Sequence, residues 1–191
     1  MRKYLWRAQI ILHAERFNPS ITTKEWLEKR LGIPKVTRFI NAVSIAVCET
    51  KELVFEATPY QVKLTGRDGE LVLEYARRLL KALPETPYTG VTVLFSYKLR
   101  GERRRKKWFE KLAPFAEEVI SQHPTDVSLR WRLLDGEIES VVEVSTVAEK
   151  KMLFVTVRSH TDANKEQILR ALAIVYEKNR MLQKDLEEAG L

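Results

Sequence analysis

The feature that most constrains the fold is a hydrophobic pattern that changes period in the same order twice along the chain. Stretches in which apolar and polar residues alternate predict strands, and stretches with apolar residues every three or four positions predict amphipathic helices. Strands are predicted at residues 5–15, 42–49, 52–58, 60–65, 90–99, 127–134, 138–147 and 151–159. Helices are predicted at residues 23–31, 69–83, 102–122 and 164–188. The pattern predicts an α+β fold made of two β-α-β-β-β-α units.

Local signals mark the ends of these elements. Side chains that accept a hydrogen bond from a backbone N–H favour the first turn of a helix. The expected caps are Thr22 or Thr23, Asp68, and Asp162 or Asn164. Asp135-Gly136 predicts a tight hairpin turn, because both residue types tolerate positive φ. Pro114 is expected to kink or split the helix at residues 102–122, since it removes a backbone donor.

One stretch of sequence supports an internal repeat. Residues 24–29 (KEWLEK) resemble residues 106–111 (KKWFEK), which lie 82 positions later, and the same offset places Ile11-Leu12 on Val93-Leu94. We therefore expect a first unit at residues 1–86 and a second at 87–191, joined in one compact pseudo-twofold domain. Antiparallel sheets joined edge to edge would carry helices on one face and leave the other face open.

In element order this arrangement resembles the TATA-binding-protein fold, a duplicated and curved sheet backed by helices. The resemblance covers the whole chain, but it includes no sequence motif of that family. It implies an architecture and transfers neither residues nor function.

Composition bounds the class of protein. Hydrophobic residues make up 45% of the 191 residues, so the chain can bury a core, and no apolar run approaches the length of roughly 20 residues that spans a bilayer. The N-terminus has no signal-peptide pattern, and Cys48 is a single cysteine expected to be buried. These observations predict a cytoplasmic protein without a membrane partner. The density of mixed charges, 31%, resembles in style hyperthermophilic proteins and the orphan proteins of archaea and their mobile elements.

Positive charge is concentrated in one segment. Residues 100–111, called here the basic segment, contain seven cations and two acids, a net charge of +5 out of +7 for the chain. The cations are Arg100, Arg103, Arg104, Arg105, Lys106, Lys107 and Lys111. Such clustering favours nucleic acid, because each neutralised phosphate releases counterions. A solvated surface in a charge-rich protein is the equally weighted alternative.

Two further arginines are candidates for the same surface. Arg130 and Arg132 alternate with apolar residues, so they share one face of a strand, and Arg158 lies on another strand of that half. If this face is the open one, it is a candidate docking surface for nucleic acid. The favoured alternative is that Glu139 and Glu143 pair with these arginines across strands.

Catalytic and metal-binding signatures are absent from the sequence. The histidines His13, His123 and His160 lack metal-ligand spacing, and no nucleophile, zinc or phosphate-loop motif occurs. Trp131 is expected in the core because it alternates with leucines. The sequence thus predicts no enzyme, no cofactor and no metal, and its main hypothesis is binding of nucleic acid, DNA in the first instance, mainly through phosphates. A protein-interaction module or homodimer is the alternative, with an unrecognised enzyme third.

Overall fold

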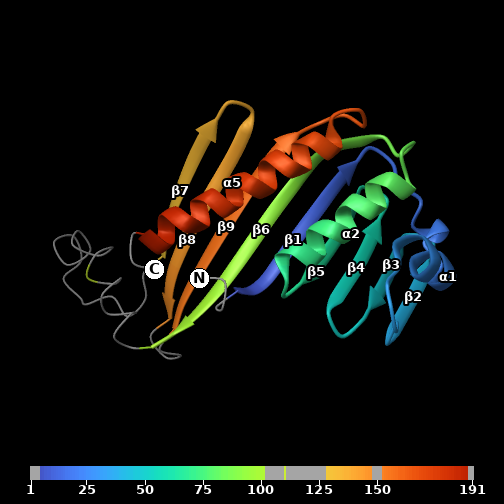
Figure 1. Cartoon of the computed structure of the whole chain (residues 1–191), viewed down its shortest axis with the longest axis horizontal. Coiled ribbons are helices and arrows are strands. Elements are labelled where there is room, and N and C mark those ends of the chain that lie inside the picture. The colour runs from blue at the N-terminus through green and yellow to red at the C-terminus, as the bar shows by residue number, and fades with distance from the viewer. Residues whose placement is uncertain (1–4, 102–109, 111–127, 148–151, 189–191) are drawn as a thin grey trace.

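One antiparallel sheet of nine strands organises the part of the chain that the structure, a computed structural model, describes: residues 5–101, 110, 128–147 and 152–188. The strands are β1 (Leu5–Ala14), β2 (Arg38–Ala42), β3 (Ile45–Glu49), β4 (Leu53–Thr58), β5 (Gln61–Gly66), β6 (Tyr88–Arg100), β7 (Ser128–Asp135), β8 (Ile138–Val147) and β9 (Met152–Asp162). Their order across the sheet is β2-β3-β4-β5-β1-β6-β9-β8-β7 (Figure 1). The α+β class predicted from the sequence is confirmed.

Several helices begin at a residue whose side chain caps the first turn. They are η2 (Pro19–Ile21), α1 (Lys24–Trp26), the π-helical turn η3 (Leu27–Leu31), α2 (Gly69–Ala82) and α5 (Ile168–Glu188). The Thr23 hydroxyl accepts a hydrogen bond from the Trp26 N–H, and Asp68 caps α2 by accepting from the N–H groups of Glu70 and Leu71. Asp162 ends β9, so Asn164 is the residue that caps the turn before α5. The helix predicted at residues 102–122 lies outside the described residues.

The stretch predicted as one strand at residues 42–49 contains the last residue of β2, a turn and β3, so the first unit has four strands after its helical turns where three were predicted. The chain turns between β2 and β3, which pair with each other from Arg38↔Glu49 to Ala42↔Ile45. The turn residue Val43 is 91% exposed. The turn was missed because Val43 and Ser44 include no glycine, proline or asparagine, the residues that usually mark a hairpin.

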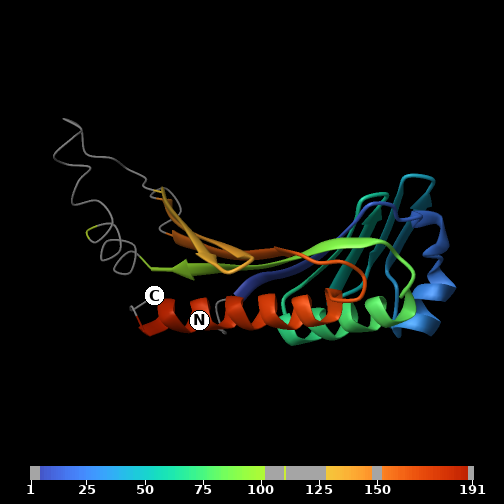
Figure 2. The same ribbon diagram turned by 90° about the horizontal axis from the view of Figure 1, so that it is seen from above.

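Both long helices cover the same face of the sheet. Figure 2 shows α2 and α5 side by side on one side, while the strands at both ends of the sheet curve away from them. Alternate residues of every central strand point into the core beneath the helices, among them Ile10, Phe55, Val93 and Val155. Burial of each such large side chain contributes roughly 1.5–3 kcal/mol relative to exposure. The opposite face, called here the open face, carries no described helix.

The two central strands, β1 and β6, pair antiparallel, with Ile10 opposite Val93 and Ile11 opposite Thr92. Outward from this pair the strands follow the order β5, β4, β3, β2 on one side and β9, β8, β7 on the other, so the first half has one described strand more than the second. The expected residue match at an offset of 82 is wrong in these strands. It aligns Leu12 with Leu94, yet Leu12 lies in the core and Leu94 on the open face, and a strand with a side-chain period of two cannot be superposed that way.

A buried polar network ties α5 to the sheet. Asn179 is fully buried, and its Nδ2 donates to the carbonyl oxygens of Val93 (3.0 Å) and Val157 (3.2 Å). Its Oδ1 accepts from the Ser159 hydroxyl at 2.6 Å. Because Ser159 gives its one proton to Asn179, the Ser140 hydroxyl, 2.7 Å away, donates to Ser159. The network positions α5 over β6, β9 and β8.

No described helix is both long enough and apolar enough to span a membrane.

Candidate nucleic-acid interface

The open face gathers cations on the strands of its second half. Residues directly paired across strands share a face, and the row Arg7, Ser96, Thr156, Glu143 and Arg130 crosses five strands from β1 to β7. The neighbouring rows on this face carry Lys98, Arg158 and Arg132. Strand pairing therefore brings residues separated by more than a hundred positions onto one surface.

The predicted site residues have different outcomes. Arg100 ends β6 and is exposed, and Arg130 and Arg132 share one face of β7, as expected, which is the open face. The remaining members of the basic segment lie outside the described residues, so the structure does not test where they are placed. They are Arg103, Arg104, Arg105, Lys106, Lys107 and Lys111.

Some of these cations are paired with acids. Arg132 Nη2 lies 2.9 Å from Glu139 Oε2, which is the pairing that the alternative interpretation expects. On the first half of the face, Arg38 pairs with Glu49 and Lys63 with Glu56. Exposed pairs of this kind contribute about 0–1 kcal/mol, so they neutralise charge more than they stabilise the fold.

Four other cations of the open face form no ion pair with any described residue. We call Arg7, Lys98, Arg130 and Arg158 the four unpaired cations. Arg130 faces Glu143 across the β7–β8 pair, but the Glu143 carboxylate instead accepts from the hydroxyls of Ser128 and Ser145. Unpaired cations on a concave sheet face leave a positive surface available to an anion.

Aromatic side chains accompany these cations. Trp6, at the start of β1, is 48% exposed and contacts Phe154 edge to face at a centroid distance of 6.3 Å. The Lys98 ammonium lies 5.7 Å from the Trp6 ring centroid and 5.9 Å from that of Phe154.

The prediction that Trp131 is buried in the core is wrong, because it lies on the edge strand β7, 40% exposed. Helix α5 packs mainly on β6 and β9, and it meets β7 at the end of that strand, where Lys178 Nζ lies 2.7 Å from Asp135 Oδ2.

A chain of titratable side chains crosses β1, β6 and β9 on the same face. His13 Nε2 and His160 Nδ1 each lie 2.9 Å from the Thr92 hydroxyl, and His160 Nε2 lies 3.3 Å from Asp162 Oδ1. The two imidazole rings are 5.4 Å apart. Sequence spacing gave no sign of this cluster, because strand pairing alone brings His13 and His160 together.

Gly90 makes room for the His160 ring. It sits between His13 on β1 and Asp162 on β9 in the strand register. A Cβ atom at this position would lie 2.9 Å from the Thr161 carbonyl oxygen and 3.3 Å from the His160 ring. A side chain here would therefore displace the histidine cluster.

The protonation of His13 depends on its burial and on the charges beside it. No group of three His, Cys, Asp or Glu side chains among the described residues is placed to hold a metal ion. Burial lowers the pKa of His13, and the neighbouring His160 lowers it further, with Asp162 opposing and Arg158 adding to the effect. His13 is therefore held neutral at pH values where a free histidine begins to charge.

We expect this lowered pKa to make the fold less stable in mild acid. The unfolded chain binds a proton at His13 more readily than the folded chain, so stability is full above the unfolded value near 6.5 and falls as the pH drops toward the folded pKa. The Tm of the wild type is expected to fall between about pH 7.5 and about pH 5.5, and His13→Gln is expected to reduce that fall. Parallel Tm profiles for the two proteins would contradict the assignment.

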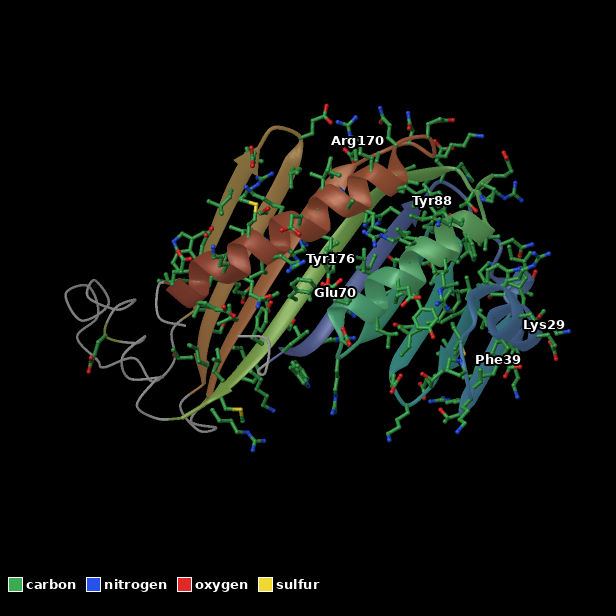
Figure 3. All side chains as sticks on the ribbon, viewed as in Figure 1. Lys29, Phe39, Glu70, Tyr88, Arg170 and Tyr176 are labelled. Atoms are coloured by element: carbon green, nitrogen blue, oxygen red, sulfur yellow. The ribbon has the colours of Figure 1, made fainter. Side chains whose placement is uncertain are left out.

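The helix-covered side has a groove of different character. It has a volume of about 390 Å³ between the start of α2 and α5, and Figure 3 shows Glu70 and Tyr176 close together there. Burial raises the pKa of both Tyr97 and Tyr176, so these phenols stay protonated. They can donate hydrogen bonds, as Tyr97 does to Gln183 at 2.8 Å, but they are poorly suited to act as bases.

Comparison with the models of known protein families finds no match for this sequence. Comparison with curated proteins finds no relative.

Proposed function

We propose that this chain binds nucleic acid, and DNA in the first instance, chiefly through backbone phosphates. The binding surface is the half of the open face formed by β1, β6, β9, β8 and β7, together with the basic segment that follows β6. The observation that carries the proposal is the gathering of the four unpaired cations on one concave face. Phosphates reward such a surface because each contact releases a condensed counterion.

The basic segment supports the same proposal from the sequence. It begins at Arg100, the last residue of β6, and Lys98 of the four unpaired cations lies two positions before it on the same face. The segment with a net charge of +5 therefore follows directly in sequence from a strand that contributes to the open face. Together, the basic segment and the four unpaired cations carry more positive charge than the cations of any one strand.

The mirrored order of strands outward from β1 and β6 supports internal duplication. We infer that residues 1–86 and 87–191 descend from one unit, although the strands do not keep the offset of 82 residues found between residues 24–29 and 106–111. The architecture is then analogous to the TATA-binding-protein fold, an analogy of element order that adds no residue to the site.

Neutralising open-face cations tests the surface directly. The triple variant K98Q/R130Q/R158Q is expected to bind a DNA strand of about 20 nucleotides more weakly, by roughly sevenfold or less for each lost phosphate contact near 0.1 M salt. The matched control R77Q/K81Q/R170Q removes three exposed cations from the helix-covered side and is expected to bind like the wild type. Fluorescence anisotropy measures both. Equal weakening of the two variants would mean that net charge, and not this face, controls binding.

A protein-interaction role is the second candidate, and one edge of the sheet favours it. Among the described strands, β7 lies at the end of the sheet, and it exposes Trp131, Leu133 (41%) and Leu134 (72%). Such an edge can pair with a second chain. Light scattering separates the candidates: a stable oligomer that ignores oligonucleotides favours this role, and a monomer that binds them favours the first.

A further inference from the structure

Trp6 occupies a bulge that turns it toward the open face. In the pairing of β1 with β6, Leu5 is opposite Tyr97 and Arg7 is opposite Ser96, so Trp6 is an extra residue on β1. A bulge of this kind re-aims a side chain. Leu5 packs on the core, whereas Trp6 contacts Lys98 and Phe154, which face each other on the open face.

Trp6 remains exposed although one aromatic ring and one ammonium group lie close to its indole. Almost half of the indole remains accessible even though Phe154 and Lys98 lie against it. An exposed indole beside cations is the arrangement by which proteins stack on nucleic-acid bases while holding the backbone. Burial of this ring by a ligand would also remove apolar surface from water.

A groove of about 260 Å³ adjoins the indole. Besides Trp6 it is lined by three cations, Arg7, Lys51 and Arg67, and by one acid, Glu52. None of the three cations forms an ion pair with a described residue. The groove therefore combines a flat apolar surface with an excess of positive charge, which matches a base and its adjoining phosphates.

We propose that Trp6 stacks on a base of a single nucleic-acid strand while Arg7, Lys51 and Arg67 bind the phosphates beside it. This inference rests on the proposed function and adds a preference to it. Bases in a duplex are stacked on each other and are not free to lie on the indole, so the site selects single strands, and it does so with little dependence on sequence.

The test compares two strands of equal charge. Fluorescence anisotropy measures binding of an oligothymidylate of about twelve nucleotides and of an abasic strand with the same number of phosphates. The wild type is expected to prefer the strand with bases by roughly 5- to 100-fold, the range for one stacked base. Trp6→Leu is expected to abolish this preference and leave binding of the abasic strand unchanged. Trp131→Leu, at an equally exposed tryptophan on β7, is expected to keep the preference.

Two further variants guard against a loss of folding. Trp6→Phe retains an aromatic ring and is expected to restore most of the preference, and K51Q/R67Q is expected to weaken binding of both strands by a similar factor. Equal binding of the two strands by the wild type, or an unchanged preference in Trp6→Leu, would overturn the stacking site while leaving phosphate binding in place. Failure of the wild type to bind either strand would overturn this inference and the proposed function together.

Discussion

Replacing Arg103, Arg104, Arg105, Lys106 and Lys107 with alanine is expected to lower the affinity for a DNA strand of about 20 nucleotides by roughly a thousand-fold or more near 0.1 M salt. Each phosphate contact to a single strand contributes about 0.7 to the slope of log K against log salt, so five lost contacts remove several powers of ten. Electrophoretic mobility shift across a protein titration measures the change.

The control is a variant with the same change of net charge elsewhere. Arg77, Lys81, Lys165, Arg170 and Lys184 are exposed on or beside the helices of the covered face. Their replacement by alanine removes five charges at a distance from the open face and is expected to change the affinity by less than about tenfold. If both five-residue variants bound equally well, the basic segment would be a solvated surface without a role in binding.

Asn179→Asp is expected to destabilise the fold by about 3–5 kcal/mol at neutral pH, a large part of the stability of an ordinary domain. The change keeps the shape of the side chain but replaces a donor with a carboxylate oxygen that faces the carbonyl oxygens of Val93 and Val157. The site is fully buried and offers no cation, so the charge is uncompensated. Urea unfolding followed by circular dichroism measures the loss.

The pH dependence of this variant identifies the cause. Burial raises the pKa of a carboxyl group, so the folded variant takes up a proton more readily than the unfolded chain, and the deficit is expected to shrink as the pH falls from about 7 toward about 5. Asn164→Asp is the control, because Asn164 is exposed and aspartate caps a helix turn equally well. A loss below about 1 kcal/mol for Asn179→Asp would show that the network does not hold α5 to the sheet.

Most of the fold could be predicted from hydrophobic period and capping residues. The strands around Ile10, Phe55 and Val155 alternate buried and exposed residues, and α2 starts at its predicted cap, Asp68. The hairpin at Val43 was missed, because a turn without glycine, proline or asparagine has no local signal. The expected match of the two halves at an offset of 82 residues failed for a different reason. A shift of one residue along a strand exchanges the side chains of its two faces.

The candidate site was less predictable because it depends on pairing between distant strands. Local alternation is enough to put Arg130 and Arg132 on one face, as expected, but whether Arg132 meets Glu139 depends on the register of β7 and β8. The meeting of His13 with His160, and of Trp6 with Phe154, requires β1, β6 and β9 to lie next to each other. No spacing within a single segment carries that information.

The account as a whole depends on positive charge that a polyanion can reach, and the salt dependence of wild-type binding measures that most directly. Affinity for a DNA strand of about 20 nucleotides is measured between about 50 and 300 mM salt. Five contacts from the basic segment and three from Lys98, Arg130 and Arg158 make about eight phosphate contacts, so the slope of log K against log salt is predicted to be about −5 to −6. A slope near zero, or no binding at the lowest salt, would contradict the account.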